Sequence, residues 1–308
     1  MTASPGQMDP RYSVSTVIVA YNSGELLRRC LAGVGDSHGE VVVVDNLPSE
    51  QTRNLCGELP HVRLIERNAN DGFGTAANAG AAATSGRWIL VLNPDAWPID
   101  DGLTRLVAYA ESRPRLGAAG PLLFDQQGRA QRSTIRPPLS PAALAAWAAF
   151  PSGLSGAYGL WRKLRWGSRQ SEAGPAEFLQ GAALLVSREA FEQMGGFDES
   201  FFMYGEDADL CARLRDAGWE VEVCPVARFV HVGAASTSSQ ADRMYIELLR
   251  SWLRLIAKRK PPGQAERARR WLLLALRMRA LRSREPQVRA AASWLASGHV
   301  DELLGAPR

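Results

Sequence analysis

Short runs of apolar residues alternate with amphipathic stretches along the first part of the chain. The runs have the length and the β-branched content of buried strands, whereas the stretches between them have the spacing of helices. The predicted strands in this part are Val14–Ala20, Val41–Val44, Val62–Ile65 and Trp88–Leu92. Their alternation with helices predicts an α/β fold with a doubly wound, mostly parallel sheet.

Helices are predicted between these strands and after them. Ser23 can cap the first, over Glu25–Val34, and Pro98 and Asp100 can start another that ends near Ser112. The remaining predicted helices are Thr75–Ala83, Ser187–Met194 and Glu206–Ala217, and the remaining predicted strands are Gly117–Phe124, Phe178–Val186 and Trp219–Cys224.

The segment 133–176 breaks this pattern. Several prolines punctuate it, and Leu160–Trp166 alternates aromatic or apolar residues with basic ones. Such a sequence suits a membrane interface, and it equally suits a packed flap whose arginines face water.

Composition narrows the class of protein. At 308 residues the chain can bury a large core. Its four cysteines are widely spaced, which indicates neither a zinc site nor a disulfide framework and favours a reducing cytoplasm. The first ten residues lack the apolar core of a signal peptide, and no run approaches the roughly 18 apolar residues of a spanning helix.

Charge is distributed unevenly along the chain. Residues 242–290 hold fourteen Lys or Arg against four Asp or Glu, whereas the whole chain has a formal net charge of +4. A tail with a net charge of +10 is therefore joined to a body with a net charge of −6. Such a tail indicates an anionic partner. An anionic membrane surface is favoured over nucleic acid, because no nucleic-acid recognition motif accompanies the charge. For Tyr245–Ile256, a helix that packs on the domain with its basic face in water is an equal alternative to membrane contact.

Polar residues follow three of the predicted strands directly. Asn93-Pro94-Asp95 comes after Trp88–Leu92, and Tyr21-Asn22 and Asp45-Asn46 end two others. Ligands of open α/β sheets bind beyond the carboxyl ends of the strands, where a carboxylate can hold a divalent cation against a bound phosphate. Asp95 is therefore a candidate cation ligand, although Asn-Pro-Asp is also a common turn sequence.

A group of acidic residues opens a later predicted helix. Glu206, Asp207 and Asp209 lie within four positions, which is more carboxylates than capping requires. Their mutual repulsion should raise the pKa of at least one of them toward the range of a general base. Glu206 or Asp207 is the candidate base, and Asp209 is assigned a structural role.

His231 is a candidate for the same cation. It follows a strand-like run and precedes the small residues Gly233–Ser236. If that segment closes over a bound diphosphate, the imidazole can join Asp95 at the metal or contact the phosphates; a purely structural histidine is the alternative.

A glycine motif supports a competing function. Gly72-Phe73-Gly74-Thr75-Ala76-Ala77 matches the dinucleotide fingerprint G-x-G-x-x-A, which would make the protein an NAD(P)-dependent oxidoreductase. The motif belongs to the third strand unit rather than the first, and residues 67–71 separate it from its strand. Asn70 and Asn78 flank it with amides that suit a sugar or a base, which a pyrophosphate turn does not need.

The motifs taken together resemble family-2 inverting glycosyltransferases of the GT-A fold, and most closely bacterial rhamnosyltransferases that use dTDP-L-rhamnose. The resemblance covers roughly residues 13–260. Besides the strand ends and the glycine turn, it rests on the run from Gly195 to Phe202 that leads into Glu206-Asp207-Ala208-Asp209. It implies an inverting transfer of a sugar from a nucleotide donor to a hydroxyl.

The resemblance also assigns roles to residues. Asp95 stands where the family's DxD aspartate binds Mg²⁺ or Mn²⁺, with Asn93 at the first position of that motif. His231 matches a late histidine of the family, and Asp207, with Glu206 beside it, matches the base. The residues implied at the donor and acceptor are Ala20, Tyr21, Asn22, Asp45, Asn46, Asn70, Gly72, Phe73, Asn78, Asn93, Gln180 and Gly181.

The domain organisation follows from these assignments. We expect a disordered leader at 1–12, a nucleotide-sugar-binding half at 13–125, an acceptor and catalytic half at 126–240 with a flap at 133–176, and basic amphipathic helices at 241–308.

The expected acceptor is a glycan or a polyprenyl-diphosphate-linked glycan of cell-envelope polysaccharide synthesis. The expected location is the cytoplasm, peripherally on the inner face of the cytoplasmic membrane, with a homodimer as an open alternative and no nucleic-acid partner. A catalytically silent nucleotide-sugar binder is a further alternative.

Overall fold

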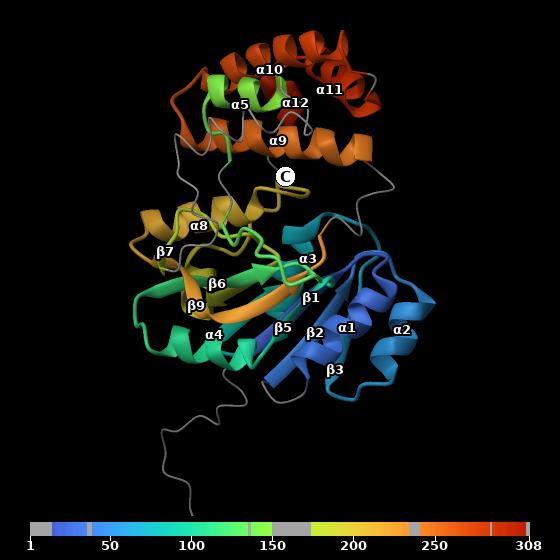
Figure 1. Ribbon diagram of the computed structural model, residues 1–308, viewed down its shortest axis with the longest axis vertical. Helices are drawn as coiled ribbons and strands as arrows, with labels where there is room; N and C mark the ends of the chain where they lie inside the picture. The colour runs from blue at the N-terminus through green and yellow to red at the C-terminus, as the bar shows by residue number, and fades with distance from the viewer. Residues whose placement is uncertain are drawn as a thin grey trace, which may run out of the picture. The chain divides into compact units, whose positions relative to one another are not determined.

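The structure is a computed structural model that describes residues 14–35, 39–134, 137–149, 174–233, 241–283 and 285–305 (Figure 1). The chain divides into two compact units. Unit 1 comprises Met1–Ile135, Gln170–Glu199 and Asp207–Ser236, and unit 2 comprises Arg136–Arg169, Ser200–Glu206 and Thr237–Arg308. The predicted leader, residues 150–173 of the predicted flap and the segment 234–240 lie outside the described residues.

Unit 1 holds all the described strands and most of the described helices. Its strands are β1 Val14–Ala20, β2 Gly39–Asp45, β3 Val62–Glu66, β4 Trp88–Leu92, β5 Ala96–Ile99, β6 Leu116–Phe124, β7 Gly174–Pro175, β8 Ala183–Ser187 and β9 Glu220–His231. Its helices are α1 Gly24–Val34, α2 Glu50–Gly57, α3 Phe73–Ala82, α4 Gly102–Glu111, α7 Arg188–Gln193 and α8 Glu206–Asp216, of which the first residue belongs to unit 2.

The described strands form one sheet in the order β3-β2-β1-β4-β8-β6-β9-β5, with β7 paired to β9. The first four strands of that order run parallel, as the alternation of strands and helices predicts. Strand β8 is antiparallel to both β4 and β6, β6 is parallel to β9, and β5 is antiparallel to β9. The α/β fold with a large parallel section is confirmed.

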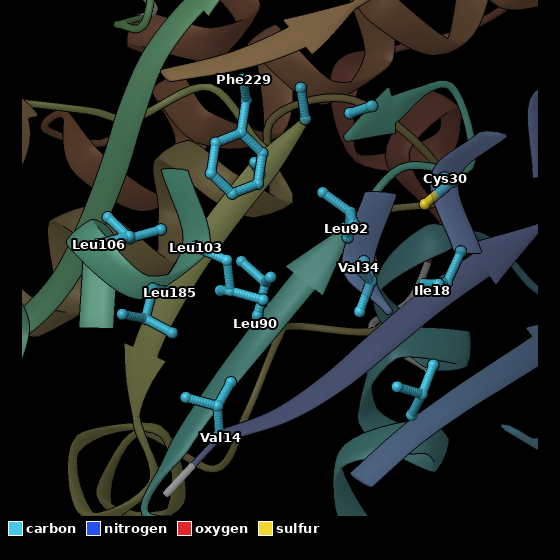
Figure 2. Close-up of a cluster of buried hydrophobic side chains, with 14 of the residues drawn as sticks. Val14, Ile18, Cys30, Val34, Leu90, Leu92, Leu103, Leu106, Leu185 and Phe229 are labelled. Carbon is cyan, nitrogen blue, oxygen red and sulfur yellow. The ribbon is translucent and has the colours of Figure 1, made fainter. Parts of the chain in front are cut away.

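Helices pack on both faces of this sheet because alternate residues of its strands point to opposite sides. On one face, side chains of β1, such as Ile18, share a core with α1, α2 and α4 (Figure 2). Figure 2 shows Leu103 and Leu106 of α4 in the same apolar cluster as Leu90 of β4. On the other face α3 lies close to the sheet, since a Cβ on Gly80 would lie 2.3 Å from Cγ1 of Val17.

Several predicted boundaries differ from the structure. Pro98 lies within strand β5, and the helix that was expected to start there begins at Gly102, after Asp100 and Asp101 take left-handed backbone angles. Strand β9 continues to His231, beyond the predicted end at Cys224. Helix α2 was not predicted. This helix is too short to show a clear apolar periodicity. Ser49 caps it by accepting a hydrogen bond from the Thr52 amide.

The predicted role of Ser23 is also corrected. Ser23 occupies the N-cap position of α1, but its side chain makes no capping hydrogen bond to that helix. Its hydroxyl oxygen instead accepts from the backbone N–H of Tyr21 at 3.1 Å. The side chain therefore shapes the turn at the end of β1.

Unit 2 is a cluster of helices. They are α5 Pro141–Ala149, α9 Ala241–Arg259, α10 Gln264–Ala280, α11 Pro286–Ala296 and α12 Val300–Leu304. Leu253 of α9, Leu276 of α10 and Leu295 of α11 are fully buried in one apolar core. The buried Arg279 pairs with Glu285 at 2.7 Å and donates to the Ala148 carbonyl at 3.1 Å. In the described part of the chain, no helix combines the length and hydropathy needed to span a bilayer.

The packing of α3 on β1 generates a test of the fold. Gly80→Ala should lower the free energy of unfolding by about 1–3 kcal/mol, because the added methyl overlaps Val17 in a well-packed interior. Urea denaturation measures this change. Gly57→Ala is the matched control: Gly57 also lies in a helix, but its Cβ would meet nothing within 4 Å, so that variant should be neutral or slightly stabilised. Equal stability of the two variants would contradict the packing.

Candidate active site

Three polar strand ends lie at the same edge of the sheet. The register pairs Ala20 of β1 with Asp45 of β2, and Ile18 of β1 with Leu92 of β4. The backbone N–H of Asn46 continues this pairing and donates to the Ala20 carbonyl at 2.9 Å. Because the strands are parallel, their carboxyl ends form one rim of unit 1.

Asp95 and His231 meet at this rim. Ala96 of β5 pairs with His231 of β9, and the Val232 amide donates to the Asp95 carbonyl at 3.0 Å. Both side chains are almost buried, and Nε2 of His231 lies 3.7 Å from Oδ1 of Asp95. The other carboxylate oxygen, Oδ2, accepts the Gly233 amide at 2.9 Å. The backbone thus fixes the carboxylate with Oδ1 toward the imidazole.

Gln131 fixes the imidazole from its other side. Its side-chain Nε2 donates to the backbone carbonyl of His231 at 2.8 Å. This bond orients the amide so that its oxygen, Oε1, faces Nδ1 of His231 at 3.1 Å. An oxygen can only accept there, so Nδ1 carries the proton and Nε2 presents its lone pair to Asp95. Burial lowers the pKa of His231, and the nearby charge of Asp95 raises it less.

These two side chains fit a divalent cation. A carboxylate oxygen and an unprotonated imidazole nitrogen face each other at 3.7 Å, too far apart for a hydrogen bond, and both are metal ligands. Gln131 accepts from the second ring nitrogen, which is the usual outer support of a metal-bound histidine. Among the described residues no three His, Cys, Asp or Glu side chains gather as a cation site. Cations held by one or two side chains are typical of sites that share the ion with substrate phosphates.

Asp207 belongs to the same rim through backbone contacts. The Asn93 amide, at the end of β4, donates to the Ala182 carbonyl at 2.9 Å. The next residue back, Gly181, donates its amide to Oδ2 of Asp207 at 2.8 Å. A Cβ on Gly181 would lie 3.1 Å from that oxygen, so glycine gives the carboxylate its space. Asp207 is thus linked to the Asn93–Asp95 turn through Gly181 and its neighbour Ala182.

The neighbours of Asp207 on α8 have other surroundings. Asp209 is buried and pairs with Nε of Arg213 at 2.7 Å, and that guanidinium also donates to the carbonyls of Met194 and Gly196. Its structural assignment is therefore favoured by its contacts. Glu206, the first residue of α8, is buried as well.

The end of β2 is tied to the glycine turn. Asp45 and Asn46 are nearly buried, and the Asn46 side-chain amide donates to the Gly72 carbonyl at 3.1 Å. Gly72 has φ +105, and its amide donates to Oδ1 of Asn70 at 3.2 Å. Burial raises the pKa of Asp45, although hydrogen bonds, including one from the Leu47 amide, act in the opposite direction. Contact of these residues with a nucleoside stays a prediction.

Asn78 holds a loop of its own unit. Its amide oxygen accepts from the Phe197 N–H at 2.9 Å, and its amide nitrogen donates to the Phe197 carbonyl at 2.9 Å and to Glu199 at 3.0 Å. Phe73 meets the ring of Phe197 edge to face at 6.3 Å between centroids. These contacts favour a positioning role for Asn78, while a sugar contact stays a prediction.

The remaining predicted residues lie along the same rim. Ala20 is buried at the end of β1, Tyr21 is half-buried, and Asn22 is exposed with a φ of +50. Gln180 is half-buried, and its backbone N–H donates to the Ser133 carbonyl at 3.0 Å. Gln131 was not predicted, because a single glutamine after a turn has no local signature.

The arrangement around His231 generates a test by NMR. In the metal-free protein we expect the Nδ1–H tautomer of His231 to dominate above the pKa, because Gln131 Oε1 accepts that proton. Gln131→Ala should remove the preference, whereas Gln127→Ala, in the turn before it, should not. Proton–nitrogen correlation spectra measure the tautomer, with His231→Asn identifying the signal. An unchanged tautomer in Gln131→Ala would contradict the assigned hydrogen bond.

Comparison with known proteins identifies the family. The model described as Glycosyl transferase family 2 matches residues 15–195, and the one described as N-terminal domain of galactosyltransferase matches residues 169–234. An N-acetylglucosaminyl-diphospho-decaprenol L-rhamnosyltransferase of Mycobacterium tuberculosis is 34% identical over 243 residues, covering 72% of this chain and 76% of that protein. A rhamnosyltransferase of Escherichia coli, WbbL, is 25% identical over 258 residues, covering 80% and 94%.

Solved structures agree on the fold. The mannosyltransferase PcManGT of Pyrobaculum calidifontis, in complex with GDP-Man and Mn²⁺, has a TM-score of 0.56 at 19% identity and covers 96% of this chain and 83% of its own. GalNAc-T7 with UDP, GalNAc and Mn²⁺ has a TM-score of 0.58 at 16% identity, over 83% and 49%. With the match over residues 15–195 and the 34% identical relative, these findings show that the chain belongs to glycosyltransferase family 2 and has the GT-A fold.

Proposed function

We propose that this glycosyltransferase moves L-rhamnose from dTDP-L-rhamnose to a hydroxyl of a glycan carried on a polyprenyl diphosphate. Two relatives are named rhamnosyltransferases, and the name of the mycobacterial one specifies a decaprenol-linked N-acetylglucosamine. The observation that carries the proposal is the placement of Asp207 at the same strand rim as the Asp95–His231 pair. A base and a cation site at one rim are what an inverting transfer requires.

The reaction needs one proton acceptor and no protein nucleophile. In the proposed step a carboxylate oxygen of Asp207 takes the proton of the acceptor hydroxyl. That hydroxyl oxygen bonds to the anomeric carbon, while the bond from this carbon to the diphosphate oxygen breaks. A single displacement of this kind inverts the anomeric centre. The amides of Gly181 and Ala208, at 2.8 and 2.7 Å from the two carboxylate oxygens, hold the base in one orientation.

The residues that would hold Mg²⁺ or Mn²⁺ are Asp95 and His231. When bound, the cation offsets the negative charge that grows on the departing nucleoside diphosphate. Gln131 keeps Nε2 of His231 unprotonated and turned toward Asp95. The mixed oxygen and nitrogen ligands accommodate Mn²⁺ as well as Mg²⁺.

The oxidoreductase alternative loses its support. The glycine turn follows β3 after the intervening residues 67–71, and the whole motif lies within the glycosyltransferase match.

A catalytically silent nucleotide-sugar binder is the remaining alternative, and it differs from the proposal in turnover alone. Incubation with dTDP-L-rhamnose and a polyprenyl-diphosphate N-acetylglucosamine acceptor, with Mn²⁺ or Mg²⁺, tests the proposal directly. Rhamnosylated product supports it, whereas donor binding without product would identify a silent binder.

The pair of cation ligands can be tested without turnover. Asp95→Asn and His231→Asn should each lose the Mn²⁺-dependent rise in melting temperature that dTDP produces, because either change removes a ligand. A ligand at 100 times its dissociation constant stabilises by about 2.7 kcal/mol, which is readily measured by thermal unfolding. Asp100→Asn, whose exposed carboxylate pairs with Arg228, is the control and should respond like wild type. A full metal-dependent shift in both ligand variants would contradict the assignment.

The base can be tested by an isosteric change. Asp207→Asn keeps the shape of the side chain but cannot take a proton, so transfer should fall by roughly 10²–10⁴ fold while binding of dTDP is retained. Initial rates and calorimetric titration with dTDP measure the two effects. Glu206→Gln is the matched comparison and should retain most of the turnover. The reverse result, with turnover kept in Asp207→Asn and lost in Glu206→Gln, would assign the role of general base to Glu206.

A further inference from the structure

Helix α10 of unit 2 carries a line of exposed apolar side chains (Figure 1 shows the helix). Trp271, Leu274, Met278 and Leu281 are 52%, 62%, 51% and 88% exposed. In the described residues the only other large apolar side chains so exposed are Leu47 and Val226, which lie in unit 1. Exposed apolar residues are thus concentrated on this one helix.

The four residues form a stripe along one face. They follow one another at intervals of three, four and three residues, which is the spacing of a helix face, and Leu281 continues it as a C-cap with helical angles. We call these four residues the α10 stripe. At 1.5 Å per residue it extends for about 15 Å. The opposite face of α10 is already used, because residues such as Leu272 and Leu276 are fully buried in the core of unit 2.

Arginines border the α10 stripe. Arg267, Arg277 and Arg282 are exposed, and none of them forms an ion pair with a carboxylate of the described residues. The acid on α10 is Glu266, which pairs with Arg269 and Arg270, and the sequence contains no Asp or Glu between it and Glu285. The surface therefore combines a narrow apolar centre with a positive margin.

We propose that the α10 stripe docks unit 2 on an anionic membrane surface, with its apolar side chains at the boundary of headgroups and acyl chains and its arginines among the lipid phosphates. Interfacial helices have this composition, since apolar side chains enter the boundary and basic ones bind anionic headgroups. Trp271 is suited to that depth because indole is amphipathic. The stripe is too short to cross a bilayer, which needs about 20 apolar residues.

A second copy of this chain suits the α10 stripe less well. A two-fold pairing of the same face would bring the arginines of both copies together without carboxylates to balance them. Stable interfaces also use roughly 20–30 residues on each side, far more than one stripe offers. The charge of the margin thus favours anionic lipid as the partner.

The biological purpose of this membrane docking rests on the proposed function, whereas the attraction of the α10 stripe to anionic lipid does not. A polyprenyl-diphosphate acceptor has its lipid chain in a bilayer, so docking would bring the enzyme to the surface where that acceptor is found. The α10 stripe would thus serve the acceptor rather than the nucleotide donor. Donor binding should accordingly be independent of every change to it.

The experiment is flotation of the full chain with vesicles of phosphatidylcholine alone or mixed with phosphatidylglycerol, at low and high salt. The double variant Leu274→Gln and Met278→Gln replaces two stripe residues with a good helix former. It should bind the mixed vesicles at least roughly tenfold more weakly. Leu47→Gln is the matched control, because Leu47 is 51% exposed but lies in unit 1, and it should bind like wild type.

A second pair of changes tests the charged margin. Arg277→Gln with Arg282→Gln should weaken binding to mixed vesicles and reduce its dependence on salt, since screening acts on charges near the surface. Binding of phosphatidylcholine alone should change little. In wild type, brominated lipid should quench part of the tryptophan fluorescence, and Trp271→Phe should remove that part.

Two results would overturn the proposal. One is equal binding of mixed vesicles by wild type and by the Leu274→Gln and Met278→Gln variant. The other is a dimer, measured by light scattering, that this variant converts to monomer while vesicle binding is unchanged, which would assign the face to a second copy. Calorimetry with dTDP and Mn²⁺ on the same samples separates the two proposals. If the wild-type protein does not bind dTDP, this result would contradict the proposed function and would leave the vesicle result unaffected.

Discussion

The antiparallel pairing of β5 with β9 is the constraint on which the candidate site depends. Residues of β5 follow the Asn93–Asp95 turn directly, and the register sets Ala96 against His231. A shift by one residue would turn His231 to the other face of the sheet and separate it from Asp95. The backbone bonds from Val232 and Gly233 to Asp95 hold that register at the rim. Strand pairing thus brings two residues that are distant in the sequence, Asp95 and His231, to one place at the rim.

A second strand contact sets the position of the proposed base. Strand β8 runs antiparallel to β4, so the residues just before β8 lie beside those just after β4. Gly181 and Ala182 occupy that place, one bonded to Asp207 and the other to Asn93. Ordered strands therefore carry the contacts of both the proposed base and the proposed cation site, and a displacement reaction requires groups held in such fixed positions. Asp45, Asn46 and the glycine turn, which we expect to contact the nucleotide, are joined by the hydrogen bond from Asn46 to the Gly72 carbonyl.

The sequence predicted the parts of this arrangement that are local. Buried strands rich in valine and isoleucine are recognisable, and the polar residues that end them, Asp45 and Asp95, could be assigned to a rim for that reason. Strand β5 was missed because Pro98 and the two aspartates after it favour a helix start. Without β5 the local pattern left His231 open between a cation ligand beside Asp95 and a structural histidine, and the resemblance favoured the ligand.

Other features depend on distant contacts that no local pattern encodes. Gln131 reaches His231 across the fold, and its role follows from two hydrogen bonds rather than from its neighbours in sequence. Asn78 was expected at the substrate, whereas its three hydrogen bonds go to Phe197 and Glu199. The basic composition of the tail was visible in the sequence, but the separation of α10 into a buried face and an exposed apolar stripe required the packing of unit 2.

The proposed reaction depends on Asp95 and His231 holding one divalent cation beside the donor diphosphate. Electron spin-echo spectroscopy of Mn²⁺ bound with dTDP tests it most directly, because it detects a nitrogen nucleus coordinated to the metal. We expect a directly coordinated imidazole nitrogen in wild type, retained in His299→Asn and absent in His231→Asn. A spectrum without coordinated nitrogen, or one that His231→Asn leaves unchanged, would contradict it.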